Sequence, residues 1–139
     1  MYTTLTPVSQ ENSFQSTILV VEDNEDNLIY ISTALSLFNY HCLIARDALT
    51  GLSLAQQWQP DLILLDVRMP QINGLELLKI LRIDWLTRKI PVIAVTALAG
   101  AKEQEMIASA GFDGCLIKPY LLEQLEDIVC LHISKKSSC

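Results

Sequence analysis

The chain has 139 residues, half of them hydrophobic, and a formal net charge of −6 at pH 7. Its length is that of one ordinary domain, and its share of apolar residues is enough for a sizeable core. The acidic balance argues against nucleic acid as a partner, because binding to phosphates needs clustered Lys and Arg.

Four cysteines occur without a C-x-x-C pair, so neither a zinc site nor a disulfide framework is expected. The first sixteen residues do not resemble a signal peptide, and no apolar run approaches the roughly 20 residues that span a bilayer. We therefore expect a reduced, cytoplasmic protein without a membrane partner. Residues 1–16 and 134–139 are expected to be flexible tails around one domain at 17–133, with no attached output domain.

The first half of the chain alternates apolar runs with segments of helical period. The β-branched run TILVV at 17–21 predicts a strand covered on both faces, and residues 40–45 are a weaker strand candidate. After Asn24, apolar residues recur every three or four positions, which predicts a helix with one buried face. Asp47 is placed to cap a second helix at 48–58.

The second half repeats this alternation three times. The predicted strands are residues 62–66, 91–96 and 114–117. The predicted helices are residues 74–85, 101–110 and 121–133. Gly111 is well placed to end one of these helices in a left-handed conformation. Five strand–helix units with short connections predict the α/β class, with a doubly wound, five-stranded parallel sheet and five helices.

Polar side chains follow the strands at the edge where open parallel sheets bind ligands. Glu22 and Asp23 follow the first strand, Asp66 ends the third, Thr96 ends the fourth, and Lys118 follows the fifth. Each residue alone has an ordinary explanation as a helix-favouring or solvated side chain at a strand end. Together they place three carboxylates, a hydroxyl and an ammonium at one edge.

Three carboxylates in one pocket repel each other, and a hard divalent cation relieves that repulsion. Mg²⁺ prefers a few carboxylates with water and phosphate oxygens, whereas Ca²⁺ favours a larger flexible loop. With Mg²⁺ held by Asp23 and Asp66, and by Glu22 directly or through water, a carboxylate can attack a phosphoryl group. Thr96 and Lys118 would stabilise the remaining phosphoryl oxygens.

Four motifs resemble a known family. These are VVEDN at 20–24, LLDVRMPQINGLELL at 64–78, VTA at 95–97 and KP at 118–119. In this order and spacing they resemble the response-regulator receiver domain, the CheY-like phosphoacceptor module of two-component signalling. The resemblance covers residues 17–133 and implies the flavodoxin-like strand order 2-1-3-4-5.

The resemblance also implies roles for individual residues. Asp66 matches the aspartate that accepts a phosphoryl group from a histidine kinase or a His-phosphotransfer protein. The implied Mg²⁺ ligands are Glu22, Asp23, Asp66 and the backbone carbonyl of Arg68. Thr96 and Lys118 match the hydroxyl and the lysine that contact the phosphoryl group. The resemblance further implies a phosphoacceptor signalling domain and not an enzyme, with self-catalysed phosphoryl transfer and autodephosphorylation as its only chemistry.

The switch region of such a domain would comprise Thr96, Ala97, Cys115 and Pro119. Cys115 stands where the family has an aromatic switch residue, and a small thiol cannot swing between exposed and buried positions as a ring does. Tyr120 is near. Family members usually have a cis peptide before the proline that matches Pro119.

Four functions remain open at this point. The first is a stand-alone receiver that switches a surface for a downstream protein target, with a possible homodimer through the fourth helix, fifth strand and fifth helix. The second is a scaffold of the same fold that does not depend on phosphorylation. A Mg²⁺-dependent phosphatase is the third, although Arg68 stands where such enzymes need a second acid. A DNA-binding regulator is the fourth and weakest, because no helix-turn-helix segment follows.

Overall fold

The computed structural model describes residues 15–69 and 72–133. Its sheet has five parallel strands in the order β2-β1-β3-β4-β5. The strands are β1 (Thr17–Val21), β2 (His41–Ala45), β3 (Leu62–Asp66), β4 (Val92–Thr96) and β5 (Gly114–Ile117). The helices are α2 (Glu25–Leu37), α3 (Ala48–Trp58), α4 (Gly74–Ile83), α5 (Ala101–Ala110) and α6 (Leu122–Ile133). The predicted fold class and strand order are confirmed.

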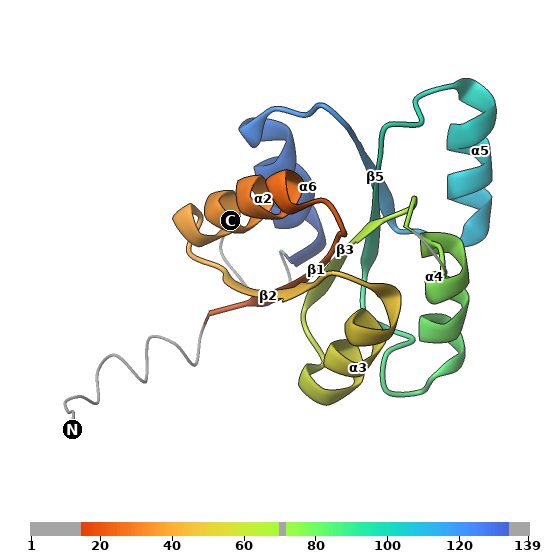
Figure 1. The fold of residues 1–139 in the computed structure, drawn as a ribbon, viewed down its shortest axis with the longest axis horizontal. Helices are drawn as coiled ribbons and strands as arrows, with labels where there is room; N and C mark the ends of the chain where they lie inside the picture. Colours follow the sequence, from red (N-terminus) through yellow and green to blue (C-terminus); the bar gives the residue numbers. More distant parts are fainter. Residues whose placement is uncertain (1–14, 70–71, 134–139) are drawn as a thin grey trace.

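Helices cover both faces of the sheet, and each face has its own core (Figure 1). On one face, α3, α4 and α5 pack against strand residues such as Leu19 and Ile63. On the other face, α2 and α6 pack against residues such as Ile18 and Leu64. Successive side chains of a strand point to opposite faces, so the central strands had to be apolar throughout. Only their carboxyl ends are free to carry polar groups.

The predicted helix caps are confirmed. The Asp47 side chain accepts a hydrogen bond from the Thr50 N–H at 2.8 Å and begins α3. Gly111 ends α5 with a φ of 105°, a conformation that costs a residue with a side chain more than glycine.

Two details of the helix predictions are wrong. Helix α4 ends at Ile83 and does not reach Trp85. Asp84 leaves the helical conformation there, and its side chain accepts a hydrogen bond from the Leu86 N–H at 2.9 Å. The last helix, predicted from residue 121, begins at Leu122, and Leu121 before it is 63% exposed.

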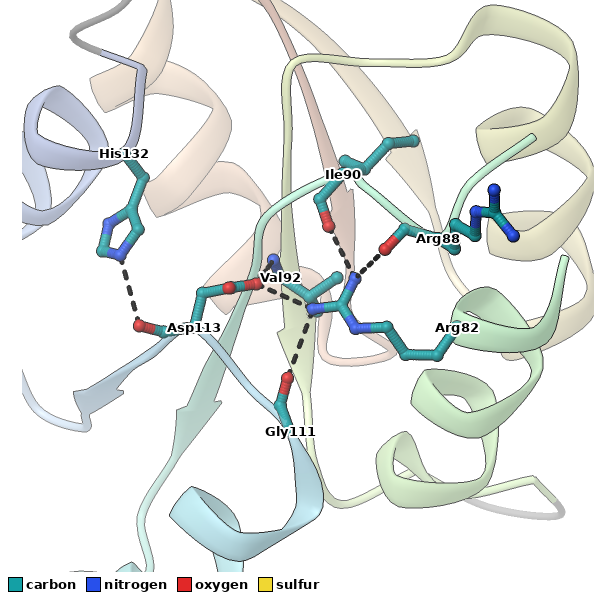
Figure 2. A network of polar contacts seen from close by, with 7 residues as sticks. All are labelled: Arg82, Arg88, Ile90, Val92, Gly111, Asp113 and His132. Atoms are coloured by element: carbon teal, nitrogen blue, oxygen red, sulfur yellow. Dashed lines mark hydrogen bonds and ion pairs between the residues drawn. The ribbon is translucent and has the colours of Figure 1, made fainter. Parts of the chain in front are cut away.

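A polar network closes the edge of the sheet where β4 and β5 begin (Figure 2). The Arg82 guanidinium at the end of α4 forms an ion pair of 2.7 Å with Asp113. It also donates hydrogen bonds to the backbone carbonyls of Arg88, Ile90 and Gly111. The Asp113 carboxylate accepts in turn from the Val92 N–H. This network joins α4, α5 and both strands.

Cys42 and Cys115 are free thiols, whereas Cys130 is disulfide-bonded, so the expectation of a reduced protein is wrong at Cys130. Of the two predicted tails, only residues 15 and 16 lie within the described residues. In the part of the chain that the structure describes, no helix combines the length and the hydrophobicity required to cross a membrane.

Candidate functional site

The polar residues predicted as a site gather at the carboxyl edge of the sheet. Glu22, Asp66 and Thr96 are buried, with exposed fractions of 2%, 5% and 1%, while Asp23 is exposed. Strand β3 pairs with both β1 and β4, and this pairing sets Asp66 between the residues that end the two neighbouring strands. The sheet topology therefore brings two buried carboxylates together at a place that is nearly closed to water.

Lys118 supplies the positive charge of the pocket. Its backbone N–H donates to the Thr96 carbonyl at 2.8 Å, which fixes where the side chain starts. Its Nζ lies 3.0 Å from Oε1 of Glu22 and 3.7 Å from Oδ2 of Asp66. One ammonium thus serves two buried carboxylates.

Backbone N–H groups orient the other oxygen atoms. The Arg68 N–H donates to Oδ1 of Asp66 at 3.0 Å, and the Asn24 N–H donates to Oε2 of Glu22 at 3.2 Å. The Leu98 N–H donates to Oγ1 of Thr96 at 3.0 Å. Oδ2 of Asp66 is left facing Lys118.

The pKa of Asp66 is raised to about 7, mainly by burial and then by the adjacent Glu22 carboxylate. The hydrogen bond from the Arg68 N–H and the charge of Lys118 act in the opposite direction without cancelling the effect. An additional positive charge beside Asp66 would lower this pKa. The pocket is therefore short of positive charge.

Glu22, Asp23 and Asp66 can present one carboxylate oxygen each, all within 4.8 Å of one another. This is a set of hard oxygen ligands at a spacing that one small divalent cation can bridge, and the exposed Asp23 leaves one side open to water. The donor set fits receiver-domain metal binding.

The turn after β3 requires glycine at position 74. A Cβ there would lie 2.7 Å from the backbone oxygen of Asp66 and from Cα of Val67. The Gly74 N–H donates to the Val67 carbonyl at 2.9 Å, so α4 begins directly against the strand that carries Asp66. Asn73 and Glu76 cap the helix reciprocally. The backbone around Asp66 is therefore held tightly.

The residues predicted as a switch region surround Lys118. Ala97 and Pro119 are exposed, and Cys115 is partly buried beside the core of the α5 side. The peptide bond between Lys118 and Pro119 is cis, as the resemblance implied. Burial raises the pKa of the Cys115 thiol, so it stays neutral at pH 7.

Two contacts at the rim of the pocket escaped sequence reasoning. The rings of Tyr30 and Tyr120 lie 5.6 Å apart, and the Tyr30 hydroxyl donates to the Tyr120 carbonyl. Arg46 forms an ion pair of 3.1 Å with Glu25. Each pair joins residues far apart in the chain, and no local pattern reports such contacts.

Comparisons with known proteins agree with this site. The family model of the response regulator receiver domain matches residues 18–130. The polar-differentiation response regulator DivK of Brucella anthropi is 39% identical over 102 residues, which are 73% of this chain and 83% of DivK.

Solved structures share the fold. The receiver domain of the sensor histidine kinase PA1611 from Pseudomonas aeruginosa PAO1, which has a magnesium ion in its active-site cleft, is 30% identical with a TM-score of 0.81. That similarity covers 86% of this chain and 98% of the domain. The chemotaxis protein CheY4 of Vibrio cholerae is 26% identical with a TM-score of 0.78, over 83% of this chain and 96% of CheY4.

The chain belongs to the response regulator receiver domains, the phosphorelay modules that communicate with histidine kinases and with downstream protein targets. It is homologous to the DivK and CheY response regulators. This class accounts for an acidic pocket at the carboxyl edge of a parallel sheet.

Proposed function

We propose that Asp66 is the phosphoacceptor of this receiver domain and takes its phosphoryl group from a histidine kinase or a His-phosphotransfer protein. The observation that carries this proposal is the contact of Lys118 with both Asp66 and Glu22 in one buried pocket. A scaffold that needed no phosphorylation would have no use for buried like charges, which cost free energy.

The transfer step uses the orientation of Asp66. Oδ1 accepts from the Arg68 N–H, so Oδ2, which faces Lys118, is the oxygen that attacks phosphorus. The bond from phosphorus to the donor histidine nitrogen breaks, and its electron pair returns to the imidazole, which takes up a proton from water. The product is an aspartyl-phosphate that water later hydrolyses.

Neighbouring residues stabilise the transferring group. The Lys118 ammonium can move from Glu22 and Asp66 toward a phosphoryl oxygen, since it is already 3.7 Å from Asp66. Thr96 lies at the adjacent strand end and can donate its hydroxyl proton to a second phosphoryl oxygen. Both contacts strengthen as charge develops on the phosphoryl oxygens.

The proposed cation is Mg²⁺, held by Glu22, Asp23, Asp66 and the backbone carbonyl of Arg68. When bound, it neutralises phosphoryl oxygens and orients the group for in-line attack. Without it, the three carboxylates repel the incoming anion.

The proposed output is a change at the surface formed by α5, β5 and α6. A Thr96 hydroxyl drawn toward the phosphoryl group pulls on Ala97 and Leu98, because the Leu98 N–H is bonded to Thr96 Oγ1. Leu98 is linked to α5, since Gln104 donates to the Leu98 carbonyl. Cys115 offers no ring to follow this movement, so we assign the transmission to this backbone link. The same surface is the proposed site of a homodimer.

Incubation with acetyl phosphate and intact mass measurement tests the phosphoacceptor. The wild-type chain should gain one phosphoryl group with Mg²⁺ and none after chelation with EDTA. Asp66→Ala should gain none, whereas Asp26→Ala, which removes an exposed acid of α2, should behave as wild type. Labelling of Asp66→Ala equal to that of wild type would refute the proposal.

A further inference from the structure

A second surface lies at the edge of the sheet opposite Asp66. A groove of about 360 Å³ lies between the segment that joins α3 to β3 and the segment that joins α4 to β4. Its apolar lining includes Pro60, Trp85, Leu86 and Pro91, and Lys89 also lines it. We call this feature the Trp85 groove.

Two large apolar side chains stand unusually exposed at this place. Trp85 lines the groove and is 75% exposed, and Ile83, the last residue of α4 two positions before it, is 81% exposed. Single exposed apolar residues are ordinary, but neighbouring ones beside a groove are typical of protein interaction sites. Tryptophan is also the residue most often found to dominate binding energy.

Charged side chains of both signs lie at the groove: Lys89 and Asp61 line it, and Arg88 precedes Lys89 in the chain. Arg88 and Lys89 are exposed, and neither forms an ion pair with any described residue. Asp61 also lines the groove, but its carboxylate accepts the Thr17 N–H at 2.8 Å. A protein with a net charge of −6 thus carries two exposed cations without an ion pair to a described residue at or next to this groove, while the carboxylate of Asp61 is held by a backbone N–H.

The segment that carries these groups is held firmly. Arg82 donates to the carbonyls of Arg88 at 3.1 Å and Ile90 at 2.8 Å, while the Arg88 side chain points away from this network (Figure 2). The buried Thr87 hydroxyl donates to the Leu81 carbonyl at 2.7 Å. A surface ordered in advance loses less entropy on binding.

We propose that the Trp85 groove binds an acidic peptide segment of a partner protein. A large apolar side chain of the segment packs on Trp85, and its carboxylates pair with Lys89 and Arg88. The net negative charge of the chain disfavours an anionic membrane and a second copy of the chain, whereas two local cations favour an acidic segment. The groove is at the opposite edge from Asp66, so a bound segment leaves the phosphoryl pocket open.

Selection of short random peptides on the full chain, with counter-selection on Trp85→Ala, tests this proposal. We expect enriched peptides to carry Asp or Glu around a large apolar residue. Their affinity, measured by fluorescence anisotropy, should fall at least about tenfold in Trp85→Ala and in Lys89→Glu. Higher salt should also weaken binding.

The chain offers matched controls. Trp58→Ala removes the other tryptophan, which is 52% exposed at the end of α3, and Lys102→Glu reverses an exposed charge on α5. Both should bind the peptides as wild type does. In a Trp58→Phe chain, the fluorescence of Trp85 should shift to the blue when peptide is added.

Several results would overturn the proposal. Enrichment of basic peptides, or of none that depend on Trp85, would do so. Trp85-dependent binding to phosphatidylserine vesicles would assign the groove to a membrane, and Trp85-dependent dimers in sedimentation would assign it to a second copy. A large gain in peptide affinity after deletion of residues 1–14 would assign it to the chain's own N-terminal segment.

Discussion

The polar clusters at the two edges of the sheet differ in their balance of charge. At the carboxyl edge there are three carboxylates and one ammonium: Lys118 contacts Glu22 and Asp66, and Asp23 can present an oxygen within 4.8 Å of theirs. At the other edge, one guanidinium meets one carboxylate and three backbone carbonyls: Arg82 with Asp113, Arg88, Ile90 and Gly111. The first edge has negative charge in excess, whereas the Arg82 network at the second edge is balanced.

This difference separates a site that awaits a ligand from a network that maintains the fold. Excess charge in a buried pocket costs stability and becomes useful when a cation and a phosphoryl group arrive. The Arg82 network holds four elements together, and its own members leave no charge for a ligand, whereas the Arg88 and Lys89 side chains lie outside it. Substitutions at the two edges should therefore change different properties.

The largest effect is expected from Lys118→Met. It removes the positive charge that we propose stabilises the phosphoryl oxygens, so Mg²⁺-dependent phosphorylation by acetyl phosphate should slow by about 100- to 1000-fold. Lys102→Met, on the exposed surface of α5, should leave the rate unchanged. Thermal melts with Mg²⁺ should verify that both variants fold. An unchanged rate in Lys118→Met would assign the charge stabilisation to another group.

Asp66→Asn should raise the stability of the metal-free protein at neutral pH. The folded-state pKa of Asp66 is about 7, above its ordinary value of 3.8, so the folded state keeps a proton that the unfolded state has lost. The contribution of Asp66 to the unfolding free energy therefore falls as pH rises from about 4 to about 7. The variant should gain roughly 2 to 4 kcal/mol relative to wild type across that interval.

Urea unfolding at several pH values measures this difference. Addition of Mg²⁺ at pH 7.5 should stabilise the wild-type chain more than Asp66→Asn, because the cation relieves the repulsion that the variant already lacks. A stability difference that does not change with pH would show that Asp66 ionises in the folded state as it does in the unfolded state.

Arg82→Ala should lower the unfolding free energy by about 2 to 3 kcal/mol, because Asp113 and three carbonyls lose a charged donor. Arg88→Ala is the matched control, since its guanidinium joins no network and the change should cost under about 0.5 kcal/mol. Urea unfolding compares the two. If both variants had equal stability, the contacts of Figure 2 would contribute nothing net.

The carboxyl edge could be predicted from the sequence, and the opposite edge could not. Asp66 and Thr96 follow directly on apolar strands, and parallel pairing brings all strand ends to one edge. Arg82 lies within a helical pattern and was not distinguishable from a solvated arginine. Its partners are carbonyls, which every residue has, so no sequence motif marks them.

The prediction of where α4 ends was wrong for a related reason. Apolar spacing continued through Trp85, and the pattern could not show that Ile83 and Trp85 stay exposed. The Asp84 side chain ends the helix by accepting the Leu86 N–H and the Gln56 amide. Competition between side chain and backbone for hydrogen bonds decides such boundaries.

The smallest effect is expected from Asp47→Ala. This variant tests whether the excess charge of the carboxyl edge acts through Glu22, Asp23 and Asp66 alone. Helix α3 begins at the carboxyl edge, but the Asp47 carboxylate accepts hydrogen bonds from the Thr50 N–H at 2.8 Å and the Thr50 hydroxyl at 3.0 Å. Loss of this cap should cost about 1 kcal/mol of stability in urea unfolding. Phosphorylation by acetyl phosphate should stay at the wild-type rate, because Asp47 is outside the group that can hold a metal. A slower rate would mean that the edge acts through its summed charge and not through the three carboxylates alone.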